Sequence, residues 1–192
     1  MKLKPHEFVL MVLWGSGGDI AGRTLLQKRC YFVAVLVAQD QPEAMGYQAH
    51  YYGPYSQVIA DALGALRSAG FVTEEACGFG VPDCAGFEVT RYDYGLTEQG
   101  KRIAERLKSE HGKDCQSIEE ACTTLTAAGE LDYVALSVAA KAYHVLRLQG
   151  RPMTYEDICT EARRYSWTIS GAQAERAAEF LERMGLVECK TA

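Results

Sequence analysis

The sequence lacks a long apolar run and an excess of positive charge. Its longest apolar stretch, residues 30–38, is much shorter than the roughly 20 residues needed to cross a bilayer. The 25 acidic residues outnumber the 20 basic ones and give a net charge of −5, so the chain has no general attraction for polyanions or anionic lipid. These features exclude a membrane span and disfavour nucleic-acid binding, although a local basic surface could still bind DNA.

The cysteines do not follow a secretory pattern. There are seven, an odd number, and the N-terminal residues lack an apolar core followed by a small-residue cleavage site. We therefore expect a cytoplasmic protein with reduced thiols. Structural zinc usually takes cysteines two to four residues apart, whereas six residues separate Cys77 from Cys84 and Cys115 from Cys122. The sequence thus predicts no metal and no cofactor, and leaves a redox or metal role of Cys77 and Cys84 open.

Motifs of catalysis are also missing. None of the four histidines has a partner at metal-ligand spacing, and there is no Walker loop or nucleophile elbow. The Gly-Ser-Gly-Gly segment at 15–18 follows an apolar helical pattern instead of a strand, so it indicates an interhelical turn and not a phosphate loop. We expect a protein that is not an enzyme.

The apolar patterns that are present predict mostly helices. Residues 7–14 and 24–39 each indicate a buried helix, the second with Gln27, Lys28 and Arg29 in its first turns. A short strand is predicted at 47–51, and a helix follows with Pro54 at its first position. That helix is strongly amphipathic, with its apolar residues three or four positions apart: Tyr55, Val58, Ile59, Ala62, Leu63 and Leu66.

One pattern occurs twice in the chain. Residues 66–72 and 181–187 both run from a helical pattern through a glycine, Gly70 or Gly185, into an apolar pair. Each predicts a helix that ends on a left-handed glycine and continues into a short strand. Residues 71–75 and 87–94 then predict a hairpin, Thr97 an N-cap, and 108–116 a linker. Capping patterns that start further helices are predicted at 117–120, 154–157 and 170–173.

These predictions give a mainly α fold with a β-hairpin wing, organised as tandem winged-helix and helix-turn-helix domains. The winged-helix domain would cover residues 1–110. A second, helix-turn-helix-like helical domain would cover residues 117–192.

Two segments resemble a known family. Residues 25–32 and 51–56 are similar to the Leu-Gln-Lys-x-x-Tyr and Tyr-Gly-Pro signature of small prokaryotic YwgA-type proteins, and more distantly to the Panacea antitoxin domain. Residues 92–100 also resemble the strand-to-helix junction of bacterial winged-helix proteins. The chain departs from the family pattern at Arg29 and Cys30, where Leu-Leu is usual before the tyrosine. The resemblance implies a winged-helix-like fold, an intracellular prokaryotic setting and, for Panacea proteins, neutralisation of a toxin by direct contact.

The tyrosine-rich segment is the candidate protein-binding surface. Tyrosine combines a large apolar ring with a polar tip and is common in interfaces, so a partner would bind Tyr51, Tyr52, Gly53, Pro54 and Tyr55. An equally weighted alternative is that the glycine and proline only shape a helix start while the rings cover the core.

DNA binding is the alternative function. It would use Gln57, Arg67, Arg91, Lys101 and Arg102, because phosphate and base contacts come mainly from such side chains. Acidic residues outnumber basic ones on the predicted wing and helix faces. We therefore expect a non-enzymatic regulatory protein, antitoxin-like or adaptor-like, that binds a protein partner or a second copy of itself.

Overall fold

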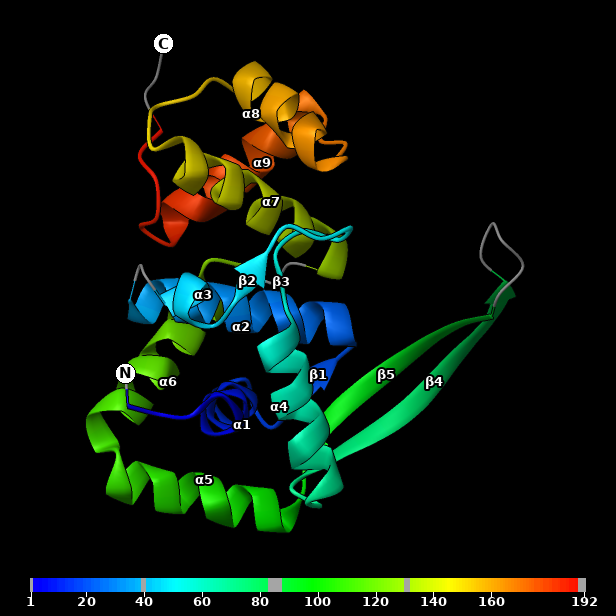
Figure 1. Cartoon of the computed structure of the whole chain (residues 1–192), viewed down its shortest axis with the longest axis vertical. Coiled ribbons are helices and arrows are strands. Elements are labelled where there is room, and N and C mark those ends of the chain that lie inside the picture. The colour runs from blue at the N-terminus through cyan, green and yellow to red at the C-terminus, as the bar shows by residue number, and fades with distance from the viewer. Residues whose placement is uncertain (1, 39–40, 83–87, 130–131, 190–192) are drawn as a thin grey trace.

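The computed structural model describes residues 2–38, 41–82, 88–129 and 132–189, which form a mainly helical fold with two small antiparallel sheets (Figure 1). The helices in the described residues are α1 (Pro5–Gly15), α2 (Arg23–Val37), α3 (Gln41–Ala44), α4 (Gln57–Ser68), α5 (Glu98–Glu110), α6 (Gly112–Ala127), α7 (Tyr133–Gln149), α8 (Tyr155–Ala162), the 3-10 turn η1 (Arg163–Tyr165) and α9 (Gly171–Arg183). The strands are β1 (Asp19–Ala21), β2 (Tyr47–Gln48), β3 (Tyr55–Ser56), β4 (Val72–Pro82) and β5 (Glu88–Leu96).

The larger sheet has the strand order β1-β5-β4 and is antiparallel throughout. Its β4–β5 hairpin, which the sequence predicted, extends away from the helical body (Figure 1). Strand β1 was not predicted: residues 15–18 lead into this strand and not directly into a helix. The strand has three residues, and only Ile20 is buried, so it carries too little alternation to be recognised. It is defined by its pairing with β5, where Ile20 faces Tyr94.

The smaller sheet pairs β2 with β3, and Tyr47 lies opposite Ser56. The prediction that Pro54 opens the following helix was wrong, because α4 begins at Gln57. Ser56 is the N-cap, and its hydroxyl accepts a hydrogen bond from the Ile59 amide at 3.1 Å. Serine satisfies a free amide of the first helical turn, which proline cannot do. Pro54 instead lies in the turn that joins the two strands.

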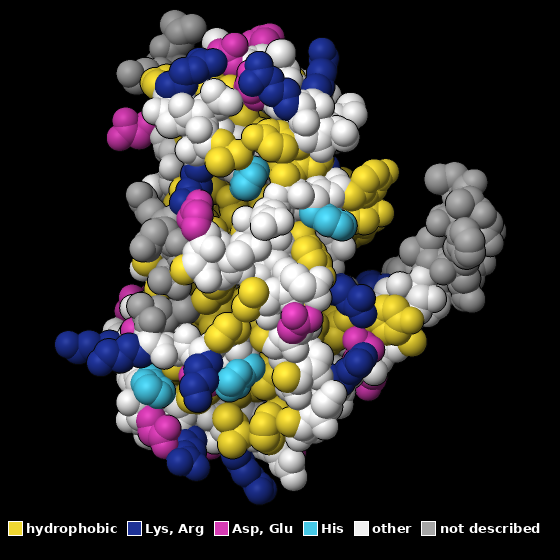
Figure 2. Space-filling model, viewed as in Figure 1, with side chains coloured by type: hydrophobic (Ala, Val, Ile, Leu, Met, Phe, Trp, Pro, Cys, Tyr) yellow, Lys and Arg dark blue, Asp and Glu magenta, His cyan; other side chains and the backbone are white. Residues whose placement is uncertain are grey.

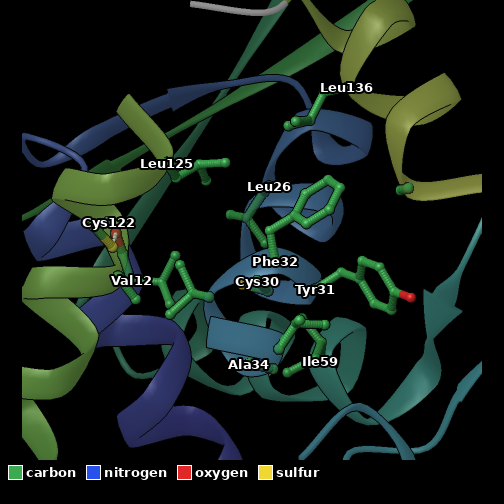
Figure 3. Close-up of a cluster of buried hydrophobic side chains, with 14 of the residues drawn as sticks. Val12, Leu26, Cys30, Tyr31, Phe32, Ala34, Ile59, Cys122, Leu125 and Leu136 are labelled. Carbon is green, nitrogen blue, oxygen red and sulfur yellow. Dashed lines mark hydrogen bonds between the residues drawn. The ribbon is translucent and has the colours of Figure 1, made fainter. Parts of the chain in front are cut away.

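The core is built around α2, which contacts α1, α4, α6 and α7 (Figures 1 and 3). Figure 3 shows side chains from these five helices meeting in one cluster, all of them buried: Val12, Leu26, Cys30, Tyr31, Phe32, Ala34, Ile59, Cys122, Leu125 and Leu136. The amphipathic pattern of α4 is confirmed for Ile59, Ala62, Leu63 and Leu66, which are buried. It was wrong for Val58, which is 40% exposed, and for Tyr55, which lies in β3 before the helix.

The polar linker predicted at 108–116 is helical in the structure, so that prediction was wrong. Helix α5 continues to Glu110 and α6 already begins at Gly112. Ser117 lies inside α6, where its hydroxyl donates to the Lys113 carbonyl oxygen at 3.1 Å instead of capping a helix. Helix α6 packs against α1 and α2. The division into units 1–110 and 117–192 stays a prediction. Helix α6, most of which was assigned to the second unit, packs against helices of the first.

The repeated glycine pattern is half confirmed. Gly70 and Gly185 both adopt positive φ, 75° and 69°, directly after helices. Residues 72–82 then form β4, whereas residues 186–189 form no strand, so that part of the prediction was wrong. A strand needs a partner for its backbone groups. β4 pairs with β5, while Leu186 and Val187 pack, half-buried, on the core.

No helix in the described ranges combines the length and the apolar character that crossing a membrane would require.

Candidate functional site at the β2–β3 turn

The two motif segments singled out in the sequence meet in the structure. The Gln27 side chain pairs with both backbone groups of Ser56: its Nε2 donates to the carbonyl oxygen at 3.0 Å, and its Oε1 accepts from the amide at 3.2 Å. The next residue, Lys28, donates from Nζ to the Pro54 carbonyl oxygen at 2.6 Å. Helix α2 thus positions the β2–β3 turn, because two side chains of the helix bond to the backbone of the turn and of β3.

Lys28 is 2% exposed, which is unusual for a lysine. Among the described residues it forms no ion pair with a carboxylate. Burial disfavours the charged amine, and the nearby Lys141 ammonium adds to the effect, so the pKa of Lys28 is lowered to about 7. The site therefore contains an amine that can gain or lose its proton near neutral pH.

The turn itself requires glycine at position 53. Gly53 has φ +98°, and a Cβ atom there would lie 3.1 Å from Lys141 Cγ and 3.3 Å from the Ser137 carbonyl oxygen. The residues that lead from β2 into the turn are also held by the segment between η1 and α9. There, the Trp167 indole donates from Nε1 to the His50 carbonyl oxygen at 2.7 Å. Contacts from α2, α7 and the segment after η1 thus fix this backbone.

The tyrosines before this glycine point into solvent. Tyr51 is 72% exposed and Tyr52 is 53% exposed, with their rings in edge-to-face contact at 4.8 Å. Hydrophobic side chains project at the level of this turn in the space-filling view (Figure 2). Tyr55 is half-buried beside His50, with ring centroids 5.0 Å apart. Gly53 and Pro54 are buried and shape the turn, but the rings of Tyr51 and Tyr52 do not cover the core.

A hollow of about 300 Å³ lies beside the turn, where α2 and the start of α4 meet it. It adjoins a second hollow of about 210 Å³, and the two share four lining residues, among them Arg23 and Tyr55. All the residues that line the first hollow are polar or aromatic, and none is acidic: Arg23, Thr24, Gln27, Lys28, His50, Tyr52, Tyr55 and Gln57.

The residues predicted for DNA binding are spread over three elements. Gln57 and Arg67 lie on α4, Arg91 on β5, and Lys101 and Arg102 on α5. Most of them bond to acidic neighbours. Arg67 pairs with Glu74, Arg91 with Asp93 at 2.6 Å, Lys101 with Glu98 at 2.8 Å, and the Gln57 amide donates to Asp61 at 2.7 Å.

The cysteines show no arrangement for metal binding within the described residues, where no three His, Cys, Asp or Glu side chains are grouped. Cys77 is half-buried on β4, and its thiol contacts an Asp93 carboxylate oxygen at 3.5 Å. Cys84, its predicted partner, lies outside the described residues. Cys115 and Cys122 are both buried on α6, as expected of small core residues.

Sequence reasoning missed the roles of Gln27 and Lys28, which it placed only as polar residues in early helical turns. A signal was available: both lie between Leu26 and Cys30, in a helix whose other sides are apolar. A helix that is apolar on all sides is buried. Polar residues within it must therefore bond to other parts of the chain.

The class that these features define is a mainly helical protein with small antiparallel sheets and a fixed, tyrosine-bearing turn. The chain is similar to the protein of Bacillus subtilis (strain 168) described as uncharacterized protein YwgA, with 33% identity over 101 residues. The match covers 51% of this chain and 52% of that protein, so the chain spans about half the length of this curated relative. No protein-family model matches the chain.

Proposed function

We propose that this chain is a non-enzymatic regulatory protein that binds another protein, or a second copy of itself, through the β2–β3 turn. The observation that carries the proposal is the exposure of Tyr51 and Tyr52 on a backbone held by Lys28, Gly53 and Trp167. Large exposed rings on a preorganised backbone bind with little loss of conformational entropy. Tyrosine is also among the residues that contribute most to interface affinity.

We further propose that residues 1–110 form a winged-helix domain and residues 117–192 a helix-turn-helix-like one. In support, the order α1, β1, α2, α4, β4, β5 places a hairpin directly after the third long helix, with β1 completing the sheet. In the second part, α7, α8 and α9 pack on one another without a strand in the described residues. This arrangement suits a binding module, because the long helices fix the turn while the hairpin stays exposed.

An antitoxin-like or adaptor-like role in the cytoplasm is the form of this proposal that the motif resemblance favours. Residues 25–32 and 51–56, which resemble YwgA-type and more distantly Panacea sequences, are the segments that build the turn. A toxin or an enzyme that the turn covers would be the partner. The affinity would come from buried aromatic surface, so it should survive raised salt.

The second candidate function is DNA binding as a dimer. The helix-and-hairpin order favours it, with Gln57 and Arg67 on α4 facing one groove and Arg91 on the hairpin. The local bonding of Arg67, Arg91 and Lys101 to carboxylates counts against it, because phosphate contacts supply most of the affinity. A mobility-shift assay on genomic fragments at low and moderate salt tests this candidate, and a shift that weakens with salt would favour it.

The test of the main proposal compares three immobilised proteins: the wild type, the double variant Tyr51→Ser/Tyr52→Ser, and Tyr155→Ser. Tyr155 is also exposed but lies on α8. Each is incubated with a lysate of the cells that make the protein, at low and high salt. The retained proteins are identified and their affinities measured after purification. Sedimentation of the free chain reports self-association.

We expect a partner or a dimer whose affinity falls about tenfold or more in the double variant and is unchanged in Tyr155→Ser. The proposal is wrong if the wild type sediments as a monomer and retains no protein. It is also wrong if the double variant binds as well as the wild type.

A further inference from the structure

The hollow beside the β2–β3 turn has a lining that differs from the rest of the chain. Acidic residues exceed basic ones overall, yet the lining combines two cations, Arg23 and Lys28, with His50 and no carboxylate. Thr24, Tyr52 and Tyr55, whose side chains carry hydroxyl groups, also line it. Such a set of donors matches a ligand that brings negative charge and oxygen acceptors.

Lys28 indicates where the negative charge would lie. Lys28 is 2% exposed. Among the described residues its amine donates one hydrogen bond, to the neutral Pro54 carbonyl oxygen at 2.6 Å. A buried ammonium without a counter-ion is costly. Lys141 of α7, near the same turn, adds further positive charge. In its charged form Lys28 therefore makes the field beside the hollow positive, and it has no carboxylate partner among the described residues.

The acidic residues of the adjoining hollow are already bonded, one of them to Arg23 itself. Asp61 and Glu74 line only the adjoining hollow. Asp61 accepts from the Gln57 amide at 2.7 Å, and Glu74 pairs with Arg67 and, at 3.7 Å, with Arg23. Arg23 also donates from Nε to the Tyr94 hydroxyl at 3.1 Å and lies over the Tyr92 ring. Its side chain is 55% exposed and its contact with Glu74 is long, so a ligand phosphate could replace Glu74 as its partner.

We propose that this hollow binds a small phosphate monoester, with Lys28 and Arg23 holding the phosphate group. A phosphate monoester carries about −1.5 to −2 charges at pH 7, which matches two cations. The volume of about 300 Å³ is at the lower end for small-molecule sites. The rings of His50, Tyr52 and Tyr55 provide apolar surface for the organic part. The inference concerns the isolated chain and does not depend on the protein-binding proposal.

Binding would be coupled to proton uptake. The pKa of Lys28 is lowered to about 7, so at pH 7.5 much of the free protein has a neutral amine there. Lys141 on α7 acts on this amine directly. The other charged or titratable residues that line the hollow are Arg23 on α2, and His50, Tyr52 and Tyr55 at the turn. A bound phosphate would favour the ammonium form, so affinity should fall about tenfold per pH unit well above 7.

The probes are phenyl phosphate and inorganic phosphate, titrated calorimetrically at constant ionic strength into the wild type, Lys28→Met, Arg23→Gln and Arg151→Gln. Arg151 is an exposed arginine in the loop between α7 and α8. Titrations at pH 7.5 in two buffers with different ionisation enthalpies give the proton uptake. Titrations at pH 8 and 9 give the pH dependence while the phosphate stays dianionic.

We expect saturable 1:1 binding, tighter for phenyl phosphate than for inorganic phosphate, with uptake of up to one proton. Affinity should fall about ten- to a hundredfold in Lys28→Met and in Arg23→Gln and stay unchanged in Arg151→Gln. Because Arg23 is exposed, its variant keeps the test valid if Lys28→Met does not fold. Absence of saturable wild-type binding overturns the proposal. Equal binding by the Arg23→Gln variant, or equal affinity at pH 8 and pH 9, also overturns it.

Discussion

Lys28 Nζ lies 2.6 Å from the Pro54 carbonyl oxygen and joins the middle of helix α2 to the turn that presents Tyr51 and Tyr52. The bond connects the two segments that the sequence singled out separately. It also places an amine where neither solvent nor a carboxylate of the described residues balances its charge. The stability of the turn should consequently depend on the protonation of Lys28.

The first prediction is that the free energy of unfolding rises with pH above neutrality. In the unfolded chain Lys28 keeps its proton up to its ordinary pKa of 10.5, whereas in the folded chain it loses it near 7. Between these values the unfolded state binds more protons, so stability rises with pH, by at most about 1.4 kcal/mol per unit. Urea unfolding between roughly pH 7 and 8.5, in phosphate-free buffers, measures this slope.

That window separates Lys28 from the buried thiols and from His144, whereas Lys141, whose pKa is also lowered by burial, adds a slope of the same sign. Burial raises the pKa of the Cys30 and Cys122 thiols above 9.0, which lowers stability as pH approaches that value. Burial lowers the pKa of His144 from 6.5, so it acts below the window. Lys28→Met should remove most of the slope, while Lys113→Met, at an exposed lysine of α6, should keep it. A slope that persists in Lys28→Met would show that another group is responsible.

The second prediction concerns Gln27. Replacing it with leucine removes the partners of both backbone groups of Ser56, which are buried. Each unsatisfied buried group costs about 1–3 kcal/mol, so Gln27→Leu should lower the free energy of unfolding by about 2–6 kcal/mol. Gln116→Leu is the matched control, because among the described residues the Gln116 amide bonds only to Glu120, on the surface. Equal losses in the two variants would contradict a special role for Gln27.

The third prediction separates backbone strain from crowding at the turn. Gly17 and Gly53 have similar φ angles, +91° and +98°, but a Cβ atom meets nothing within 4 Å at Gly17 and three close atoms at Gly53. Gly17→Ala should therefore cost about 1–2 kcal/mol from strain alone. Gly53→Ala should cost about 2–4 kcal/mol, because Lys141 Cγ and the Ser137 carbonyl oxygen, at 3.1 and 3.3 Å from the new Cβ atom, must also give way. Urea unfolding curves of the two variants measure these costs. Equal shifts of the two curves from the wild type would show that crowding at Gly53 adds nothing to the backbone strain.

Local patterns in the sequence predicted the parts of the fold that local physics decides. The apolar spacing of Ile59, Ala62, Leu63 and Leu66 predicted the buried face of α4. Gly70 predicted the helix end before β4, because few other residues accept a positive φ. The capping boxes at Thr154 and Ser170 lie at the starts of α8 and α9. These features depend on residues within a few positions of each other.

The features that were missed depend on distant partners. Strand β1 is defined by the register that places Ile20 opposite Tyr94, and no local pattern encodes such a pairing. The same applies to Gly185, whose following residues have no strand to pair with. The tyrosine turn was recognised from its composition. The hollow beside it, however, forms only when Lys28 and Arg23 are brought next to residues 50–57 by the packing of α2.

The fourth prediction is that the chain unfolds in one cooperative transition, although two units were predicted from the sequence. The two tryptophans report on opposite parts: the Trp14 indole donates to Glu119 on α6 at 2.9 Å, and the Trp167 indole to the His50 carbonyl oxygen at 2.7 Å. Buried residues of α6 and α7 join those of α1 and α2 in a single core, and loss of one part would expose apolar surface of the other. In Trp14→Phe, the fluorescence of Trp167 and the far-UV circular dichroism should give the same urea unfolding curve. In Trp167→Phe, the fluorescence of Trp14 and the circular dichroism should likewise coincide. Two separated midpoints within either variant would instead indicate units that unfold independently.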